Sequence, residues 1–340
     1  MKNGIRGALG VLVSALLLWW TMKDTSVHAI WDVLSKSSLP LWIACMVFAT
    51  AIFPLRARRW QALLAPVYGR LPFRSLWQST AIGMMATNVL PLRAGEFARA
   101  FALSRAEAQV KFTAAFASVA VDRLFDGAVV LLLMLLATLD PAFPSQQPIG
   151  DHTLAYYLKP TALFLAIVLA GLVSFVVAPD RVFAISDAIM RRVAPRFEPR
   201  VRGLLEGFVS GLHVLRSPLL IAEVFFWTVL HWLCNAFAFW LGFRAMGLSA
   251  PFSAGMLIQG LVAIGVSVPS TPGFFGPFEF FGKAGLAVYG VSSAAAVGWV
   301  LGFHVLSFIP ITIMGAWYLT RMKLHFRDFS GAANAPSTAA

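Results

Sequence analysis

Three charged residues lie deep inside an apolar stretch, where a charge needs a chemical reason to be present. Asp122, Arg123 and Asp126 follow Phe112 by 10 to 14 residues, in a run that predicts a helix over residues 112–139. This is roughly 15 to 21 Å of rise, near the middle of a membrane if the helix spans one. An unpaired charge there costs at least ~2.5 kcal/mol. Asp122 and Asp126 share a helix face, so we expect both to face cationic partners or a wet cavity.

Natural partners for these carboxylates occur earlier in the chain, at Arg93 and Arg99, which together with Glu96 form a ladder of charged positions spaced by three residues. A half-helix that begins after Pro91 would direct its positive N-terminus, and Arg93, at an anion such as a phosphate. A purely structural interpretation is also open, in which these charges only neutralise one another and hold the fold. A cluster of this size is costly where apolar side chains could pack instead, and this favours a functional site.

The stretch at residues 81–103 is weakly repeated at residues 263–286. Both begin with Ala-Ile-Gly, break at proline and glycine, and continue with an acidic residue among phenylalanines. The predicted hinges are Pro91 and Gly95 in the first stretch and Pro272, Gly273 and Gly276 in the second. Paired interruptions in corresponding halves of a membrane protein indicate a transporter binding site.

The second stretch carries its own ionisable residues. Glu279 and Lys283 are four residues apart, which predicts an ion pair on one helix face. Adding the spacing of the two prolines to Arg123 gives His304 in the last predicted helix. His304 and His231 are each either a satisfied core histidine or a group that couples transport to protons.

The composition is that of an integral membrane protein. Of the 340 residues, 59% are hydrophobic and 12% are charged, whereas soluble domains carry roughly 25% charged residues. Apolar runs of membrane-spanning length recur without alternating strands, which predicts an all-α polytopic protein. The net charge of +12 is explained by basic cytoplasmic loops, so nucleic acid is not expected. The two cysteines, in apolar segments, form neither a disulfide framework nor a zinc motif, and no metal is expected.

The basic clusters predict about six full spans plus two re-entrant helical hairpins, with both termini in the cytoplasm. The first span is expected near residues 8–20, where a signal peptide is the competing interpretation. A second span over residues 39–55 ends in Arg56, Arg58 and Arg59, which we assign to a cytoplasmic loop. Each broken stretch is too long for one span and too short for two, so it predicts a re-entrant hairpin. Three crossings separate the hairpins, so they must enter from opposite faces as an inverted repeat.

A single transmembrane domain is expected over residues 1–329, with repeat halves at about 39–139 and 219–320. The connector at residues 180–217 has seven arginines and two amphipathic patterns. It predicts either interfacial helices on anionic lipid or a packed cytoplasmic connector. The tail at residues 330–340 is small and polar, which is typical of disorder.

Three ordered motifs resemble the lysylphosphatidylglycerol synthase transmembrane (flippase-like) domain family over about residues 5–322. They are Asn88-x-x-Pro91-x-Arg93-x-Gly95-Glu96 followed by Arg99, Asp122-Arg123-x-x-Asp126, and Pro269-x-x-Pro272-Gly273-x-x-Gly276-x-x-Glu279. The resemblance implies a relation to the membrane half of enzymes that make and flip aminoacylated phosphatidylglycerol, and to stand-alone members linked to hopanoid or polyprenyl lipids. The chain lacks the aminoacyl-transferase domain, which leaves translocation as the implied function.

We therefore expect a non-enzymatic, cofactor-free transporter in the bacterial inner membrane that moves a phosphate-bearing amphipathic lipid between leaflets. Its headgroup would bind at Arg93, Glu96, Arg99, Asp122, Arg123, Asp126, Glu279, Lys283 and His304 while the hairpins gate alternately. Nothing encodes ATP hydrolysis, so movement would be downhill or coupled to protons or to the membrane potential.

One alternative is an accessory protein that binds a lipid-modifying enzyme through residues 180–217. Another is a membrane transferase with Asp122 or Glu96 as base.

Overall fold

The computed structural model describes residues 2–90, 94–149, 178–193, 217–267 and 271–325, together with residues 152, 153, 156, 160, 163, 164, 166, 167, 170, 174 and 328. These residues form eleven α-helices and one short antiparallel strand pair, β1 (Pro148–Ile149) with β2 (His152–Thr153). The all-α prediction is confirmed. Within the described part of the chain, α3, α10 and α13 are long and apolar enough to cross a membrane.

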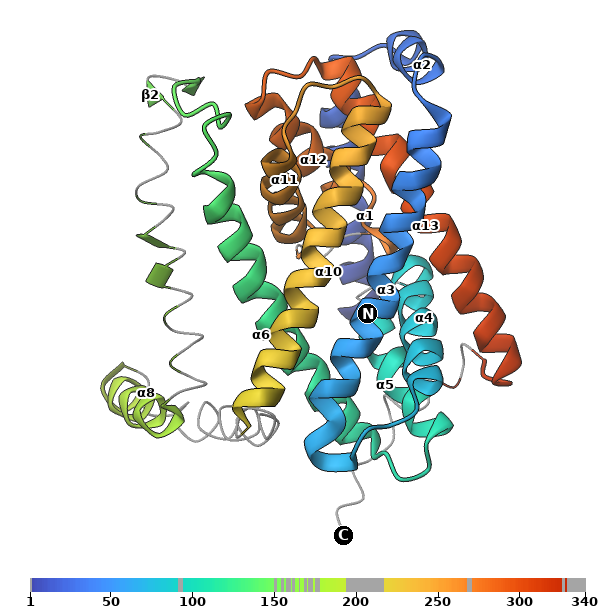
Figure 1. Cartoon of the computed structure of the whole chain (residues 1–340), viewed down its shortest axis with the longest axis vertical. Helices are drawn as coiled ribbons and strands as arrows, with labels where there is room; N and C mark the ends of the chain where they lie inside the picture. Colours follow the sequence, from blue (N-terminus) through green and yellow to red (C-terminus); the bar gives the residue numbers. More distant parts are fainter. Residues whose placement is uncertain are drawn as a thin grey trace.

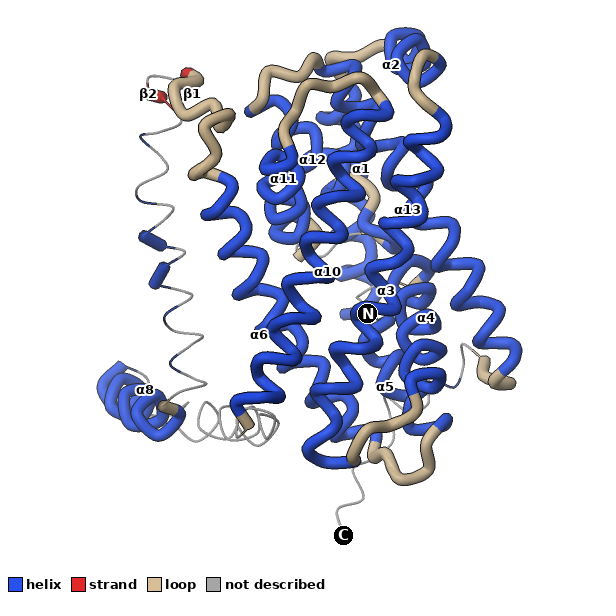
Figure 2. The backbone as a smooth tube through the Cα atoms, in the orientation of Figure 1, coloured by secondary structure: helices blue, strands red, loops and turns tan. Residues whose placement is uncertain are grey.

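The same order of long and short helices occurs twice along the chain. The first series is α1 (Lys2–Met22), α2 (Val27–Ser35), α3 (Leu39–Tyr68), α4 (Phe73–Val89), α5 (Ala94–Ala106) and α6 (Phe112–Ala137). The second is α8 (Pro179–Val193), α10 (Pro218–Ala245), α11 (Phe252–Gly265), the 3-10 turn η3 (Pro272–Phe274), α12 (Pro277–Val288) and α13 (Ser293–Arg321). A long helix, two short helices and a long helix thus occur in α3 to α6 and again in α10 to α13. Figure 1 shows α3 beside α10 at the centre, and Figure 2 shows the same helical bundle as a tube.

The short helices α4 and α5 form an antiparallel pair. A Cβ atom added to Gly95 would lie 1.9 Å from Thr87 Oγ1 and 2.1 Å from the Gly83 carbonyl oxygen, and one added to Gly83 would lie 2.5 Å from the Cβ atom of Arg99. The two backbones therefore touch through glycine. Gly95, predicted as a hinge, lies within α5 and serves this close contact. Helix α4 ends at Val89 and α5 begins at Ala94; residues 91–93, which include Pro91 and Arg93, fall outside the described residues.

The second pair, α11 and α12, is separated by η3. Gly273 and Gly276 have φ values of +71° and +98°, a region that residues with a Cβ atom rarely adopt. Together with Pro272 they make the turn, as the prolines and glycines of the sequence predict. Thr271, next to this turn, donates its backbone N–H to Ser14 Oγ of α1 at 3.0 Å. Figure 1 draws α11 and α12 toward the top of the molecule and α4 and α5 toward the bottom, with η3 against α4 between them.

The main correction concerns α3. The span predicted to end at residue 55 continues to Tyr68 and includes Pro54, so Arg56, Arg58 and Arg59 belong to the helix and not to a loop. Arg56 and Arg59 are buried. The helix continues because carboxylates on a distant helix face these two arginines and offset the cost of burying them. The predicted span at residues 158–178 lies mostly outside the described residues, as do residues 194–216 of the connector, Pro269 and the tail.

Candidate functional site

The centre of the site is Arg59, whose side chain is fully buried between α3 and α6. Its Nη2 atom lies 2.6 Å from Asp122 Oδ1, and its Nη1 atom lies 2.6 Å from Asp126 Oδ1. The four-residue spacing of the two aspartates places both carboxylates on the face that α6 turns to α3. One planar guanidinium can bind two carboxylates because its N–H groups form a fixed fork. Arg59 therefore joins the two helices at the deepest charged point of the fold.

Asp122 also receives a second arginine, from α5. Arg99 Nη1 lies 3.0 Å from Asp122 Oδ2, and the Arg99 guanidinium lies 3.9 Å from the centre of the Trp60 ring. Trp60 is itself held by a 2.8 Å hydrogen bond from its Nε1 to Ser118 Oγ. The first short-helix pair is thus attached to α3 and α6 through one buried carboxylate.

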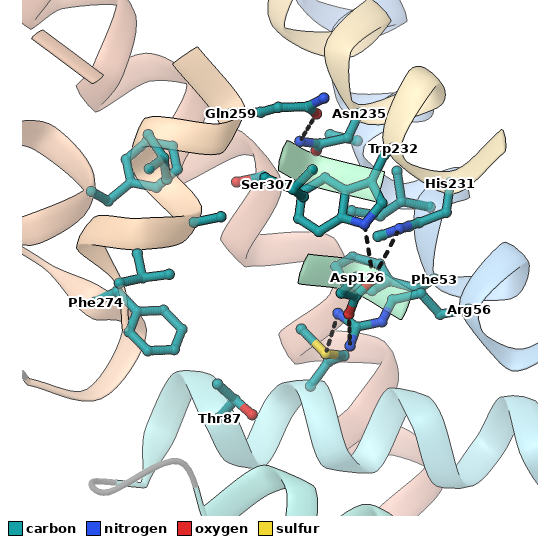
Figure 3. A pocket seen from close by; sticks show the side chains of 18 of the residues that line it. Phe53, Arg56, Thr87, Asp126, His231, Trp232, Asn235, Gln259, Phe274 and Ser307 are labelled. Carbon is teal, nitrogen blue, oxygen red and sulfur yellow. Dashed lines mark hydrogen bonds and ion pairs between the residues drawn. The ribbon is translucent and has the colours of Figure 1, made fainter. Parts of the chain in front are cut away.

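Asp126 faces the interior of the bundle and contacts α10. Trp232 donates from Nε1 to Asp126 Oδ1 at 2.8 Å, and Arg123 Nη1 lies 3.3 Å from Asp126 Oδ2. His231 Nδ1 is 4.0 Å from the same carboxylate. Figure 3 shows Trp232, His231 and Arg56 directed at Asp126 from two different helices. Arg123 also binds Glu96 of α5, with Nη2 2.6 Å from Oε1, at a partly exposed position.

Arg56 is the arginine of this cluster that is least engaged by carboxylates. Its Nη2 atom lies 3.9 Å from both Asp122 and Asp126, and its Nη1 atom reaches the Met84 sulfur at 3.9 Å. Its buried Nε atom has no hydrogen-bond partner. The described cluster contains four arginines, at positions 56, 59, 99 and 123, and three carboxylates, at positions 96, 122 and 126. The described cluster therefore carries one net positive charge.

Next to this cluster is a cavity of about 610 Å³. Arg56, Glu96, Arg123 and Asp126 line its charged side. Its other walls are largely apolar, and their aromatic side chains come from α3, α10, the η3 turn, α12 and α13: Phe53, Trp232, Phe239, Phe274, Phe278, Phe303 and Phe308. Gln259 and Asn235 form a hydrogen-bonded pair in the wall at 3.0 Å, visible in Figure 3. The cavity therefore has the two-sided chemistry of an amphipathic ligand, with a charged end and an apolar remainder.

The cavity also reaches a second polar pair, His304 of α13 and Glu279 of α12. His304 Nδ1 lies 2.5 Å from Glu279 Oε1, and His304 Nε2 lies 2.8 Å from the Gly273 carbonyl oxygen. The other carboxylate oxygen of Glu279 accepts the Gly276 N–H at 2.6 Å. The histidine ring stacks on Phe275, with 4.5 Å between ring centroids. Both residues were predicted, and they meet at the turn of the second short-helix pair.

The ion pair predicted between Glu279 and Lys283 is replaced by other contacts. Lys283 Nζ donates to the Thr21 carbonyl oxygen at 2.6 Å, so Lys283 is directed at the end of α1 while Glu279 binds His304. The predicted residues Glu96, Arg99, Asp122, Arg123 and Asp126 do come together. Arg93 lies outside the described residues. No group of His, Cys, Asp and Glu placed to hold a metal is found in the part of the chain that the structure describes.

Sequence reasoning missed two of the cluster's arginines. Arg56 and Arg59 follow an apolar run, and this pattern is typical of the cytoplasmic end of a span. Their spacing of three residues was the available signal, since it places both on one helix face toward the buried aspartates. Trp232 gave no signal, because an indole in an apolar helix is most often a packing residue.

Comparison with known proteins identifies the family. The family model described as the lysylphosphatidylglycerol synthase TM region matches residues 7–315. The chain belongs to this family. One relative, a UPF0104 membrane protein from Pyrococcus horikoshii, is 23% identical over 95% of this chain and 98% of its own length. Another UPF0104 membrane protein, from Methanothermobacter thermautotrophicus, is 22% identical over 93% of this chain and 92% of its own. The predicted family and multi-pass membrane character are confirmed.

Proposed function

We propose that this family member is a lipid transporter that moves a phosphate-bearing amphipathic lipid between the leaflets of the bacterial inner membrane. The observation that carries the proposal is the cavity of about 610 Å³ that both short-helix pairs help to line. It combines an arginine-containing charged side with apolar walls that include seven aromatic side chains. A lipid needs both, because its headgroup is polar and its chains are not.

The proposed membrane topology follows from the repeated helix order. The pairs α4–α5 and α11–α12 are re-entrant hairpins that enter from opposite faces, and six full spans surround them with both termini in the cytoplasm. Such inverted repeats bind their substrates near the midplane, at the repeat interface. The position of the cavity between the two hairpins supports this arrangement. Alternate movement of the hairpins would open it to one leaflet and then to the other.

Arg56 is the residue we propose as the main phosphate ligand. Arg59 and Arg99 are held by carboxylates at 3.0 Å or less, whereas Arg56 has only 3.9 Å contacts and lines the cavity. A guanidinium matches phosphate oxygens bidentately. Arg123, also on the cavity wall, would add charge, while Arg59 would hold the aspartates in place.

The test is a translocation assay in proteoliposomes. A short-chain fluorescent phosphatidylglycerol in the outer leaflet is quenched by an impermeant reductant, and the protected fraction is followed over time. We expect wild-type protein to equilibrate the two leaflets much faster than protein-free vesicles. The matched control is Arg70→Gln, since Arg70 forms an exposed pair with Glu223 at 2.7 Å and neither residue lines the cavity. Equal rates with and without wild-type protein would refute the proposed function.

The absence of enzymatic activity is also proposed, as is the absence of a cofactor. The charged residues of the site are engaged in ion pairs that hold helices together, which suits binding more than bond cleavage. The accessory role, in which the chain partners a lipid-modifying enzyme through the connector, predicts a different result. It predicts no translocation of any membrane lipid and a stable complex with that enzyme on size-exclusion chromatography.

A further inference from the structure

The two halves of the molecule pair their buried carboxylates with different side chains. In the first half the buried carboxylates of α6 face arginines, which stay charged at any physiological pH. In the second half the buried carboxylate of α12, Glu279, faces His304 of α13. Histidine is the side chain whose charge ordinarily changes between pH 5 and pH 8. The second half therefore contains a group that can exchange a proton where the first half has fixed charges.

The hydrogen bonds define how many protons the pair holds. The Gly273 carbonyl can only accept, so His304 Nε2, at 2.8 Å, must carry a proton. His304 Nδ1 and Glu279 Oε1 are 2.5 Å apart and must share a second proton, because two bare acceptors would repel at this distance. Glu279 Oε2 is occupied by the Gly276 N–H. The doubly protonated form of the pair is therefore the one that satisfies all these contacts, whichever of the two atoms formally carries the shared proton.

Loss of one proton changes what holds the turn of the second hairpin. The pair then consists of a carboxylate, which only accepts, and a neutral imidazole with one N–H group. That N–H group faces Glu279 from Nδ1, which leaves Nε2 as a bare acceptor opposite the Gly273 carbonyl. The link from α13 to the η3 turn becomes a repulsive contact. The released proton passes into the cavity, because His304 lines it.

Other charged groups around the pair do not substitute for this exchange. Lys283, on the same helix as Glu279, is bound to the Thr21 carbonyl. The described parts of α1 from residue 10, α11 and η3 have no titratable side chain, and α13 has none besides His304 before Tyr318, which accepts a hydrogen bond from Trp77 at 3.0 Å. Across the cavity lie the charged residues of the first half and one further histidine: Arg56, Glu96, Arg123, Asp126 and His231. Their carboxylates already face arginines.

We propose that Glu279 and His304 form a proton-binding site that couples lipid movement to the proton gradient, with the protonated pair keeping the second hairpin closed. This proposal rests on the proposed transport function and adds its energy source. One proton leaves when the hairpin opens and one returns when it closes, so one proton is exchanged per lipid. The pH gradient should therefore change the ratio of lipid between the two leaflets.

The experiment uses the full chain in proteoliposomes with fluorescent phosphatidylglycerol, with the membrane voltage set to zero by valinomycin and equal potassium. A gradient of one pH unit should shift the steady-state leaflet ratio by up to about tenfold. A trapped pH-sensitive dye should report proton movement only when the lipid is supplied. His28→Gln, at a histidine whose side chain is 88% exposed, is the matched control and should keep both responses.

Glu279→Gln removes the exchangeable proton of the pair while preserving its hydrogen bonds to Gly276 and His304. The glutamine oxygen can accept the Gly276 N–H and its amide can donate to His304 Nδ1, which fixes the ring proton on Nε2. We expect a melting temperature within a few degrees of wild type, translocation slowed at least tenfold, and no lipid-dependent proton signal. Wild-type translocation with a leaflet ratio that ignores the pH gradient would overturn the coupling, even if the variant fails to fold. So would a folded Glu279→Gln protein with wild-type translocation and proton signal. Wild-type protein that moves no lipid would instead overturn the proposed transport itself.

Discussion

At the scale of single residues, the cluster divides into arginines that hold the fold and one that remains available. Arg59 lies 2.6 Å from each of two carboxylates and is fully buried. Arg56, one helical turn earlier, has no carboxylate oxygen closer than 3.9 Å. Because a buried charge is tolerated only with compensation, these two neighbours should differ when they are replaced.

Arg59→Gln should destabilise the protein severely. After the substitution, Asp122 still contacts Arg99 at 3.0 Å and Arg56 at 3.9 Å. Asp126 loses its shortest ion pair, the 2.6 Å contact with Arg59. Removal of one partner from a buried ionic cluster costs about 3–5 kcal/mol, whereas the exposed Arg70–Glu223 pair contributes about 1 kcal/mol or less. Denaturant-induced unfolding in detergent micelles should therefore separate Arg59→Gln from the Arg70→Gln control. Equal midpoints for the two variants would show that Arg59 is not the structural centre.

The acidic half of this cluster could be predicted from the sequence, and the basic half only in part. Carboxylates at positions 122 and 126 are conspicuous because, apart from Arg123, their neighbours in the sequence are apolar. Arg59 follows an apolar run in a basic cluster, a pattern that favours a cytoplasmic loop. Its partner Asp126 is 67 residues away, and no local pattern shows which distant helix will face it. The contact between His304 and Glu279 was likewise unseen, although the repeat marked both residues.

At the scale of elements, two glycines determine how closely the helices α4 and α5 of the first hairpin pack. Gly95 and Gly83 let the backbones of α4 and α5 touch, and this places Arg99 against Asp122. In the second hairpin, two glycines with positive φ make the turn. The hairpins thus use the same residue type for two different physical reasons.

Gly95→Ala should push α4 and α5 apart. The new Cβ atom would lie 2.1 Å from the Gly83 carbonyl oxygen, a backbone atom that cannot move alone. Overpacking of this kind costs about 1–3 kcal/mol, which the unfolding midpoint should report. Gly127→Ala in α6 is the matched control, since its Cβ atom would meet nothing within 4 Å and alanine favours a helix. Indistinguishable midpoints for the two variants would contradict the close contact.

A second element-level prediction concerns movement of the second hairpin against α1. Ser14 Oγ and Thr271 Oγ1 are 3.0 Å apart, so a Ser14→Cys, Thr271→Cys pair in a background without Cys45 and Cys234 should cross-link on oxidation. The bond should slow translocation at least tenfold, and reductant should restore it.

The matched control is the Thr25–Ser293 pair, whose hydroxyl oxygens are 2.7 Å apart away from the turn. Its cysteine version should cross-link without slowing translocation. Full translocation with the Ser14–Thr271 bond closed would show that the second hairpin does not gate.

The order of these elements was largely predictable, because proline and glycine interrupt the same place in two related stretches. The length of α3 was not predictable. A proline at position 54 followed by three arginines indicates the end of a span, and only burial against α6 allows the helix to continue to Tyr68. The close packing of α4 on α5 required the positions of two glycines in space, which spacing along the chain does not supply.

At the scale of the whole molecule, two halves with the same helix order enclose one cavity and contribute unequal chemistry to it. The first half supplies permanent charge through Arg56 and Arg123, and the second supplies most of the aromatic wall and the Glu279–His304 pair. Under the proposed function, a substrate between them would be held by its anionic head on one side and by its apolar part on the other. This division is the physical basis for proposing a phosphate-bearing lipid.

The central claim is that the cavity selects its lipid by the phosphate. The most direct measurement compares translocation of two fluorescent lipids with identical chains in the same vesicles, a phosphatidylglycerol and a neutral glycolipid. We predict that the wild-type protein moves the phospholipid at least tenfold faster and that Arg56→Gln brings the ratio close to one. Equal wild-type rates for the two lipids, or a ratio unchanged by Arg56→Gln, would contradict the account.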